Sequence, residues 1–108
     1  PALPVQLPVM NPDSDELLRA QLNAETGRLS WTELQRHFAR GVVIKVAPGM
    51  DLVEVALGVA RDDKTRIADW LATGRMGRAS SEDAIDWNAR DAVFWAVVTA
   101  PWVLVQET

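Results

Sequence analysis

The segment that most restricts the fold is the stretch at residues 91–106, DAVFWAVVTAPWVLVQ, where apolar residues occupy both sets of alternating positions. Successive side chains of a β-strand point to opposite faces of a sheet. A strand with one face in water alternates apolar and polar residues, whereas this stretch needs a cover on both faces. The sequence therefore predicts strands at residues 93–98 and 102–105 that lie between two layers.

Pro101 interrupts this segment, and proline has no N–H group to donate to a central ladder. Either a tight connection at residues 99–101 makes a hairpin, or one bent strand runs along a sheet edge, and we favour the hairpin. A third strand is predicted at residues 42–46, VVIKV, because this run is short, β-branched and closed by Pro48 and Gly49.

Capping signals indicate where the first helices begin. Asp13 or Ser14 can cap a first helix that runs to about Arg28. A second helix is predicted at residues 31–40, because Ser30 and Glu33 can form a capping box at its start.

Apolar residues recur at helical spacing over residues 52–71, which predicts one long third helix. The charged stretch at residues 61–64 leaves room for a break, so two shorter helices are the alternative. Ser80 or Ser81 can cap a fourth helix that ends near Ala89. The expected fold is α+β, with about four helices packed on a small, mainly antiparallel sheet of three strands.

The length of 108 residues fits one domain. Residues 1–12 hold four of the six prolines and are expected to form a proline-rich N-terminal arm. Residues 13–108 are expected to form a single α+β domain. Hydrophobic residues make up 48% of the chain, which is ordinary for a globular protein with a real core.

Composition argues against several classes of function. The net charge of -4 argues against nucleic-acid binding, which needs clustered Lys and Arg. Without cysteine the chain has no disulfide framework, thiolate chemistry or thiolate zinc site. No apolar run approaches the ~20 residues that span a bilayer, and the first ten residues lack the basic region of a signal peptide. We therefore expect a cytoplasmic protein without a membrane segment.

Glu25 and Asp63 each fall within the apolar stripe of a predicted helix. A carboxylate that faces a core must be paired, hydrogen-bonded or protonated. One interpretation is structural, with each acid bound to an arginine or to free backbone N–H groups ahead of a helix. The other is that the two converge as a carboxylate pair that shares a proton or holds a divalent cation.

Basic residues form two candidate contact regions. Arg36, His37 and Arg40 lie opposite the apolar side of the second predicted helix, where a solvated charged face is the simpler interpretation. Arg75 and Arg78 belong to a glycine-containing loop that could hold a phosphate, although such loops are usually plain connections. Neither region matches a P-loop or dinucleotide pattern.

Five tryptophans and no tyrosine make the aromatic content lopsided. Trp87, Trp95 and Trp102 crowd the last third of the chain and are expected to be mostly core. An exposed one would mark a binding surface, because tryptophan is enriched in interface anchors, and Trp87 and Trp102 are kept as candidates.

Several short motifs occur in a characteristic order: Leu22-Asn23 with Glu25-Thr26, Trp31-Thr32-Glu33-Leu34-Gln35, Asp51-Leu52-Val53-Glu54-Val55-Ala56, and Pro101-Trp102-Val103-Leu104-Val105-Gln106. Over residues 17–106 this order resembles the uncharacterised bacterial family DUF2288. The resemblance implies a small bacterial cytoplasmic protein and carries over no catalytic residues.

No set of nucleophile, base and orienting group can be assembled from the sequence, and no cofactor or metal site is expected. The leading hypothesis is a non-catalytic protein-interaction or regulatory module with an unknown protein partner, and we expect a homodimer. The alternative is a small enzyme or a ligand- or metal-binding protein that uses the carboxylate pair of Glu25 and Asp63.

Overall fold

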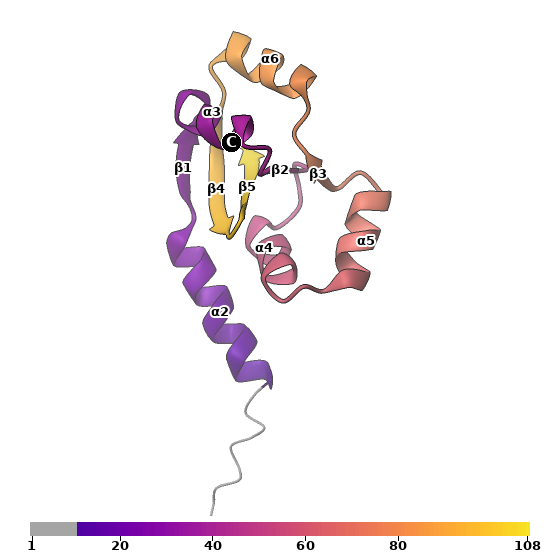
Figure 1. Ribbon diagram of the computed structural model, residues 1–108. Helices are drawn as coiled ribbons and strands as arrows, with labels where there is room; N and C mark the ends of the chain where they lie inside the picture. The colour runs from indigo at the N-terminus through magenta and orange to yellow at the C-terminus, as the bar shows by residue number, and fades with distance from the viewer. Residues whose placement is uncertain (1–10) are drawn as a thin grey trace, which may run out of the picture.

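A mixed sheet forms the centre of the computed structural model, which describes residues 11–108 and the side chains from Asp15 onwards (Figure 1). Within these residues the chain forms five helices and five strands. In chain order they are α2 (Asn11–Glu25), β1 (Gly27–Ser30), α3 (Trp31–Ala39), β2 (Val43–Val46), α4 (Leu52–Ala60), α5 (Lys64–Ala72), β3 (Met76–Arg78), α6 (Ser81–Arg90), β4 (Val93–Thr99) and β5 (Trp102–Glu107).

The strands follow the order β1-β4-β5-β2-β3. β4 and β5 form the expected antiparallel hairpin, with Thr99 opposite Trp102 and a cis peptide bond between Ala100 and Pro101 in the turn. β2 runs parallel to β5, and the other neighbouring pairs are antiparallel. The predicted α+β class is confirmed, and the sheet is mixed, with three antiparallel neighbouring pairs and one parallel pair.

The predicted count of three strands is wrong, because short strands occupy both edges of the sheet. The first helix ends at Glu25 rather than near Arg28, and β1 pairs with β4 from Gly27 to Ser30. β3, in the expected loop after Gly74, pairs with β2. Glycine lowers helix propensity at Gly27, and the ladder to β4 then satisfies the backbone. Such short polar segments carry little alternation from which to predict a strand.

The single long third helix is also wrong, and the alternative of two helices is what the chain forms. α4 ends before Asp62, whose backbone is left-handed at φ 54°. Asp63 then caps α5, its Oδ1 accepting a hydrogen bond from the Arg66 N–H at 3.2 Å. Left-handed backbone ends a helix, and aspartate is among the residues that tolerate it.

The sheet separates two hydrophobic clusters, as the apolar C-terminal strands require. Helices α2, α4 and α5 cover one face, where Val97 and Leu104 are buried. Helices α3 and α6 cover the other face, where Phe94 and Val103 are buried. An ion pair between Arg19 and Glu54 also ties α2 to α4. We call these two sides the α4 face and the α6 face.

The predicted arm at residues 1–12 falls mostly on residues 1–10, which lie outside the described residues; α2 begins at Asn11. No helix within residues 11–108 is long and apolar enough to cross a membrane.

Candidate functional site

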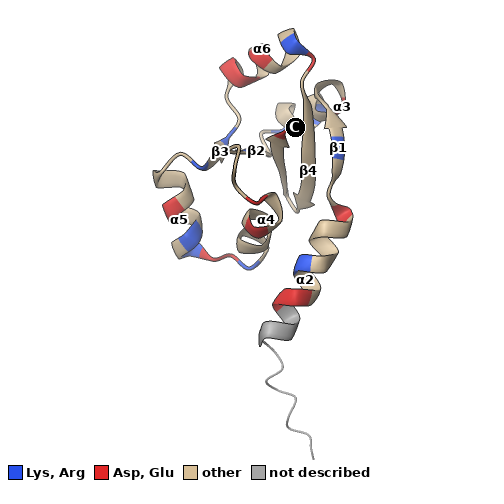
Figure 2. Cartoon of the chain, turned by 180° about the vertical axis from the view of Figure 1, so that it is seen from behind, with Lys and Arg blue, Asp and Glu red and all other residues tan. Residues whose placement is uncertain are grey.

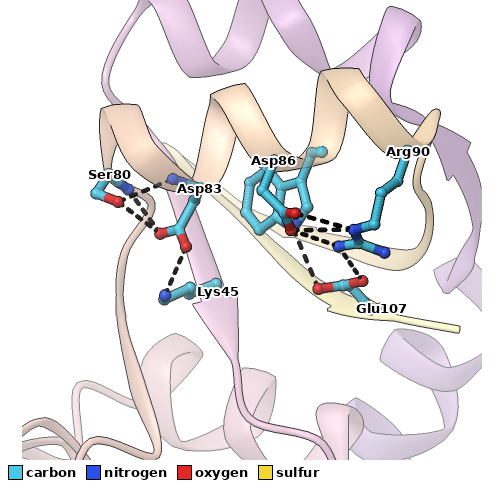
Figure 3. A network of polar contacts seen from close by, with 7 residues as sticks. Lys45, Ser80, Asp83, Asp86, Arg90 and Glu107 are labelled. Carbon is cyan, nitrogen blue, oxygen red and sulfur yellow. Dashed lines mark hydrogen bonds and ion pairs between the residues drawn. The ribbon is translucent and has the colours of Figure 1, made fainter.

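A hollow of about 500 Å³ lies between α6 and the sheet. Trp87 and Phe94 supply apolar lining, and Lys45, Asp83 and Glu107 supply charge. We call this hollow the α6 groove. Figure 3 shows that its polar side chains come from α6 on one side and from the strands on the other.

Asp83 attaches the beginning of α6 to the sheet. Its Oδ2 accepts hydrogen bonds from the N–H group of Ser80 at 2.8 Å and from the Ser80 hydroxyl at 3.0 Å, which completes a capping box. Its Oδ1 accepts from Lys45 Nζ at 2.9 Å (Figure 3). Burial favours the neutral acid, but the hydrogen bonds from Ser80 and Lys45 together outweigh it and lower the pKa of Asp83.

The other end of α6 is held by Glu107 of β5. Glu107 accepts from Trp87 Nε1 at 3.1 Å and from Arg90 Nη2 at 2.9 Å. Arg90 also donates to Asp86 at 2.7 Å, and this hydrogen bond lowers the pKa of Asp86. Figure 2 shows the same arrangement as a charge pattern, with the acidic residues of α6 near its start and the basic one at its end. That pattern complements the helix dipole.

These contacts favour a structural role for the charges of the α6 groove. Each carboxylate has a partner within the chain, and the lowered pKa values keep Asp83 and Asp86 ionised at neutral pH. An ionised acid with a low pKa is poorly suited to donate or accept protons near pH 7. Among the described residues, no three His, Asp or Glu side chains are placed to hold a metal ion.

Asp83→Asn should remove a pH-dependent part of the stability. Because the folded pKa of Asp83 lies below its ordinary value of 3.8, its contribution is present above that value and is lost as the pH falls through the folded pKa. We expect the variant to be less stable at pH 7 by up to about 1 kcal/mol, since caps and surface ion pairs contribute this much. The difference from wild type should shrink as the pH is lowered below 3.8 and further through the folded pKa. Urea unfolding at pH 7 and at a series of lower pH values measures it.

Asp69→Asn is the matched control, because Asp69 is exposed and forms no ion pair within residues 15–108. A gap between wild type and Asp83→Asn that stays constant with pH would contradict the assignment.

The sequence predicts that Glu25 and Asp63 face the core, but the structure buries neither of them fully. Glu25 is exposed at the last position of α2, beyond the buried Leu22, and accepts from Gln21 Nε2 at 3.3 Å. Asp63 is half-buried and caps α5. The expectation of a carboxylate facing the core is wrong for both, because each lies at a helix end where the predicted stripe assumed a continuing helix. Glu25 therefore forms a local pair, and Asp63 forms the cap of a helix.

The basic candidates lie at the surface. Arg36 is exposed on α3, Arg40 is exposed at the C-cap that follows it, and His37 is half-buried. Arg75 is exposed after α5, and Arg78 is exposed on the edge strand β3. The α3 residues remain a solvated charged face, since Glu33 bonds to Ser30 in the capping box instead of to His37.

The tryptophans are arranged differently from the expectation. Trp87 is 3% exposed and packs edge-on against Phe94, so it cannot serve as a surface contact. Trp102 is half-buried beneath the Arg78 guanidinium. Trp95, which was expected to be core, is 40% exposed. The sequence could not show that Trp95 is exposed, because both alternating faces of β4 are equally apolar.

Trp95 lies at the centre of a small exposed surface. It points to the same face of β4 as Val97, but the helices of the α4 face cover Val97 and leave Trp95 partly open. Val93, 39% exposed, is two residues away on that face. Arg28 lies opposite Trp95 in the β1–β4 register, its guanidinium 5.0 Å from the ring centroid. We call Arg28, Val93 and Trp95 the Trp95 patch.

Comparison with known proteins gives a family and a related structure. Residues 17–107 match a family described as "Protein of unknown function (DUF2288)". The NMR solution structure of PA1075 from Pseudomonas aeruginosa is similar to this chain, with a TM-score of 0.75 and 46% sequence identity. The similarity covers 84% of this chain and 84% of that chain. No curated protein matches the sequence.

Proposed function

The chain belongs to the DUF2288 family, and we propose from its surface that it is a non-catalytic protein-interaction or regulatory module that binds a partner through the Trp95 patch. The observation that carries the proposal is that Trp95 is 40% exposed on β4, the strand next to the edge strand β1. Tryptophan and arginine are enriched among the residues that dominate binding energy, and here they stack on each other.

The chemistry of the described side chains supports a non-catalytic role. The hydroxyl groups of Ser30 and Ser80 are engaged in helix caps, so neither is a free nucleophile. Asp83, Asp86 and Glu107 are paired with cations of the same chain. These engaged groups favour binding over catalysis.

Trp95→Thr should abolish capture of the partner while leaving the fold intact. Threonine suits a strand and removes the large aromatic surface, so we expect recovery of the partner to fall at least about tenfold. Chemical cross-linking and affinity capture from lysate of the source cells, quantified by mass spectrometry, measures this loss.

Ile85→Thr is the matched control, because Ile85 is 70% exposed but lies on α6, away from the patch. Proteins recovered equally with wild type, Trp95→Thr and Ile85→Thr would rule out the Trp95 patch as the binding surface. Thermal unfolding of each variant establishes that the fold is retained.

The 46% identical relative from Pseudomonas aeruginosa supports a bacterial role for the family. The cytoplasmic location and the homodimer expected from the sequence stay predictions. Size-exclusion chromatography with light scattering over a range of concentrations tests the dimer.

A further inference from the structure

A second hollow, of about 230 Å³, lies on the α4 face between α5 and the edge of the sheet that β3 forms. Ile44, Met76 and Trp102 line it from three strands. Ile67 and Leu71, one turn apart on α5, line it from the helix side. We call it the α5 hollow.

The packing of α5 explains why this space stays open. Trp70 of α5 is buried against α4 at Gly58, so the tight contact of α5 is with its neighbouring helix. Ile67 and Leu71 then face the strands across the hollow, and Leu71 keeps 51% of its surface exposed. Large aliphatic side chains that remain uncovered beside a concave apolar lining are typical of a ligand site.

A single charged residue, Arg78, lines the hollow. Its guanidinium lies over the Trp102 ring, 5.1 Å from the centroid. Within residues 15–108, Arg78 has no carboxylate in ion-pair distance, whereas Arg19 and Arg61 each have one and Arg90 has two. Stacking on the Trp102 ring holds the Arg78 guanidinium beside an apolar space, and its N–H donors are free to bind an anion.

We propose that the α5 hollow binds a small carboxylate with an apolar body, an aryl- or short alkyl-carboxylic acid. The apolar body fills the space between α5 and the strands, and the carboxylate accepts hydrogen bonds from Arg78. The size fits, because an engineered cavity of about 150 Å³ binds benzene, and this hollow is larger by about half. This binding is separate from the Trp95 patch and holds whether or not that patch binds a protein.

Titration with 3-phenylpropionate, followed by ¹H–¹⁵N NMR of the labelled chain, tests the proposal. We expect saturable shifts at Ile67, Leu71 and Arg78 and at the Trp102 indole. Arg78→Gln should weaken binding by about tenfold or more, because hydrogen bonds to a charged group are the stronger ones. The neutral probe 3-phenylpropanol should bind wild type weakly, with an affinity that Arg78→Gln leaves unchanged.

Arg75→Gln is the matched control, since Arg75 is exposed nearby and does not line the hollow. Equal binding by wild type and Arg78→Gln, equal affinity of wild type for the acid and the alcohol, or no saturable shift overturns the proposal. So does a shift of the same signals on concentrating the protein alone, which would assign the hollow to a second copy of the chain. The acid-to-alcohol comparison uses wild type, so it decides even where a variant does not fold.

Discussion

Phe94→Ala should lower the free energy of unfolding by about 3–5 kcal/mol, the usual cost of removing a buried aromatic ring. Phe94 has no exposed surface and lies at the centre of the cluster on the α6 face. Its ring meets Trp87 edge-on, with centroids 4.8 Å apart, and that indole also donates to Glu107. The substitution therefore leaves a cavity beneath the one tryptophan that links α6 to β5.

The effect is large relative to the total free energy of unfolding of a native domain, roughly 5–15 kcal/mol. Urea unfolding monitored by tryptophan fluorescence measures it. Val98→Ala is the matched control, because Val98 is on the same strand but 57% exposed, and we expect a loss below about 1 kcal/mol. Similar losses for the two variants would contradict the position of Phe94 at the centre of a packed layer.

The elements predicted correctly are those whose signals are local. The helix at residues 31–40 ends one residue earlier, and its capping box of Ser30 and Glu33 is present. The hairpin around Pro101 is confirmed because the proline lies in the turn, where no ladder N–H is needed. Each of these features depends on a few neighbouring residues, so the local sequence pattern is sufficient to predict it.

The edge strands and the break between α4 and α5 depend on distant contacts or on one backbone angle. β1 is a strand because β4 pairs with it, and β4 lies more than sixty residues further along the chain. The break depends on the left-handed conformation of Asp62, which periodicity does not detect. Once the helix ends there, Asp63 moves from an apolar stripe to a cap.

The two surfaces proposed for binding could not be predicted from the sequence, because they too depend on contacts between distant parts of the chain. The Trp95 patch exists because α2 and α4 cover only part of one sheet face. The extent of that cover depends on how the helices pack on the sheet. The α5 hollow joins residues of α4, α5 and three strands. Arg78 was noted from the sequence as part of a basic loop, but its role beside Trp102 required the register of β3 on β2.

Gly58→Ala should destabilise the protein by up to about 2 kcal/mol, although alanine is the better helix former by about 1 kcal/mol. Gly58 is in the middle of α4, and an added Cβ would lie 2.8 Å from Cη2 and 2.9 Å from Cζ3 of Trp70. The ring is 6% exposed and carries the Arg66 guanidinium 4.8 Å from its centroid, so it cannot swing away freely. Overpacking of this kind costs about 1–3 kcal/mol, occasionally more, which exceeds the gain in helix propensity.

The sign of the effect should reverse when the ring is removed. In a Trp70→Leu background, we expect Gly58→Ala to stabilise α4 by about 0.5–1 kcal/mol, because only the helix propensity remains. The coupling between the two positions would then be about 2 kcal/mol, well above the error of a double-mutant cycle in urea unfolding. Equal effects of Gly58→Ala in the two backgrounds would mean that the glycine is not needed for the close approach of Trp70. That contact holds α5 against α4, so the same cycle measures how strongly this approach couples the two helices.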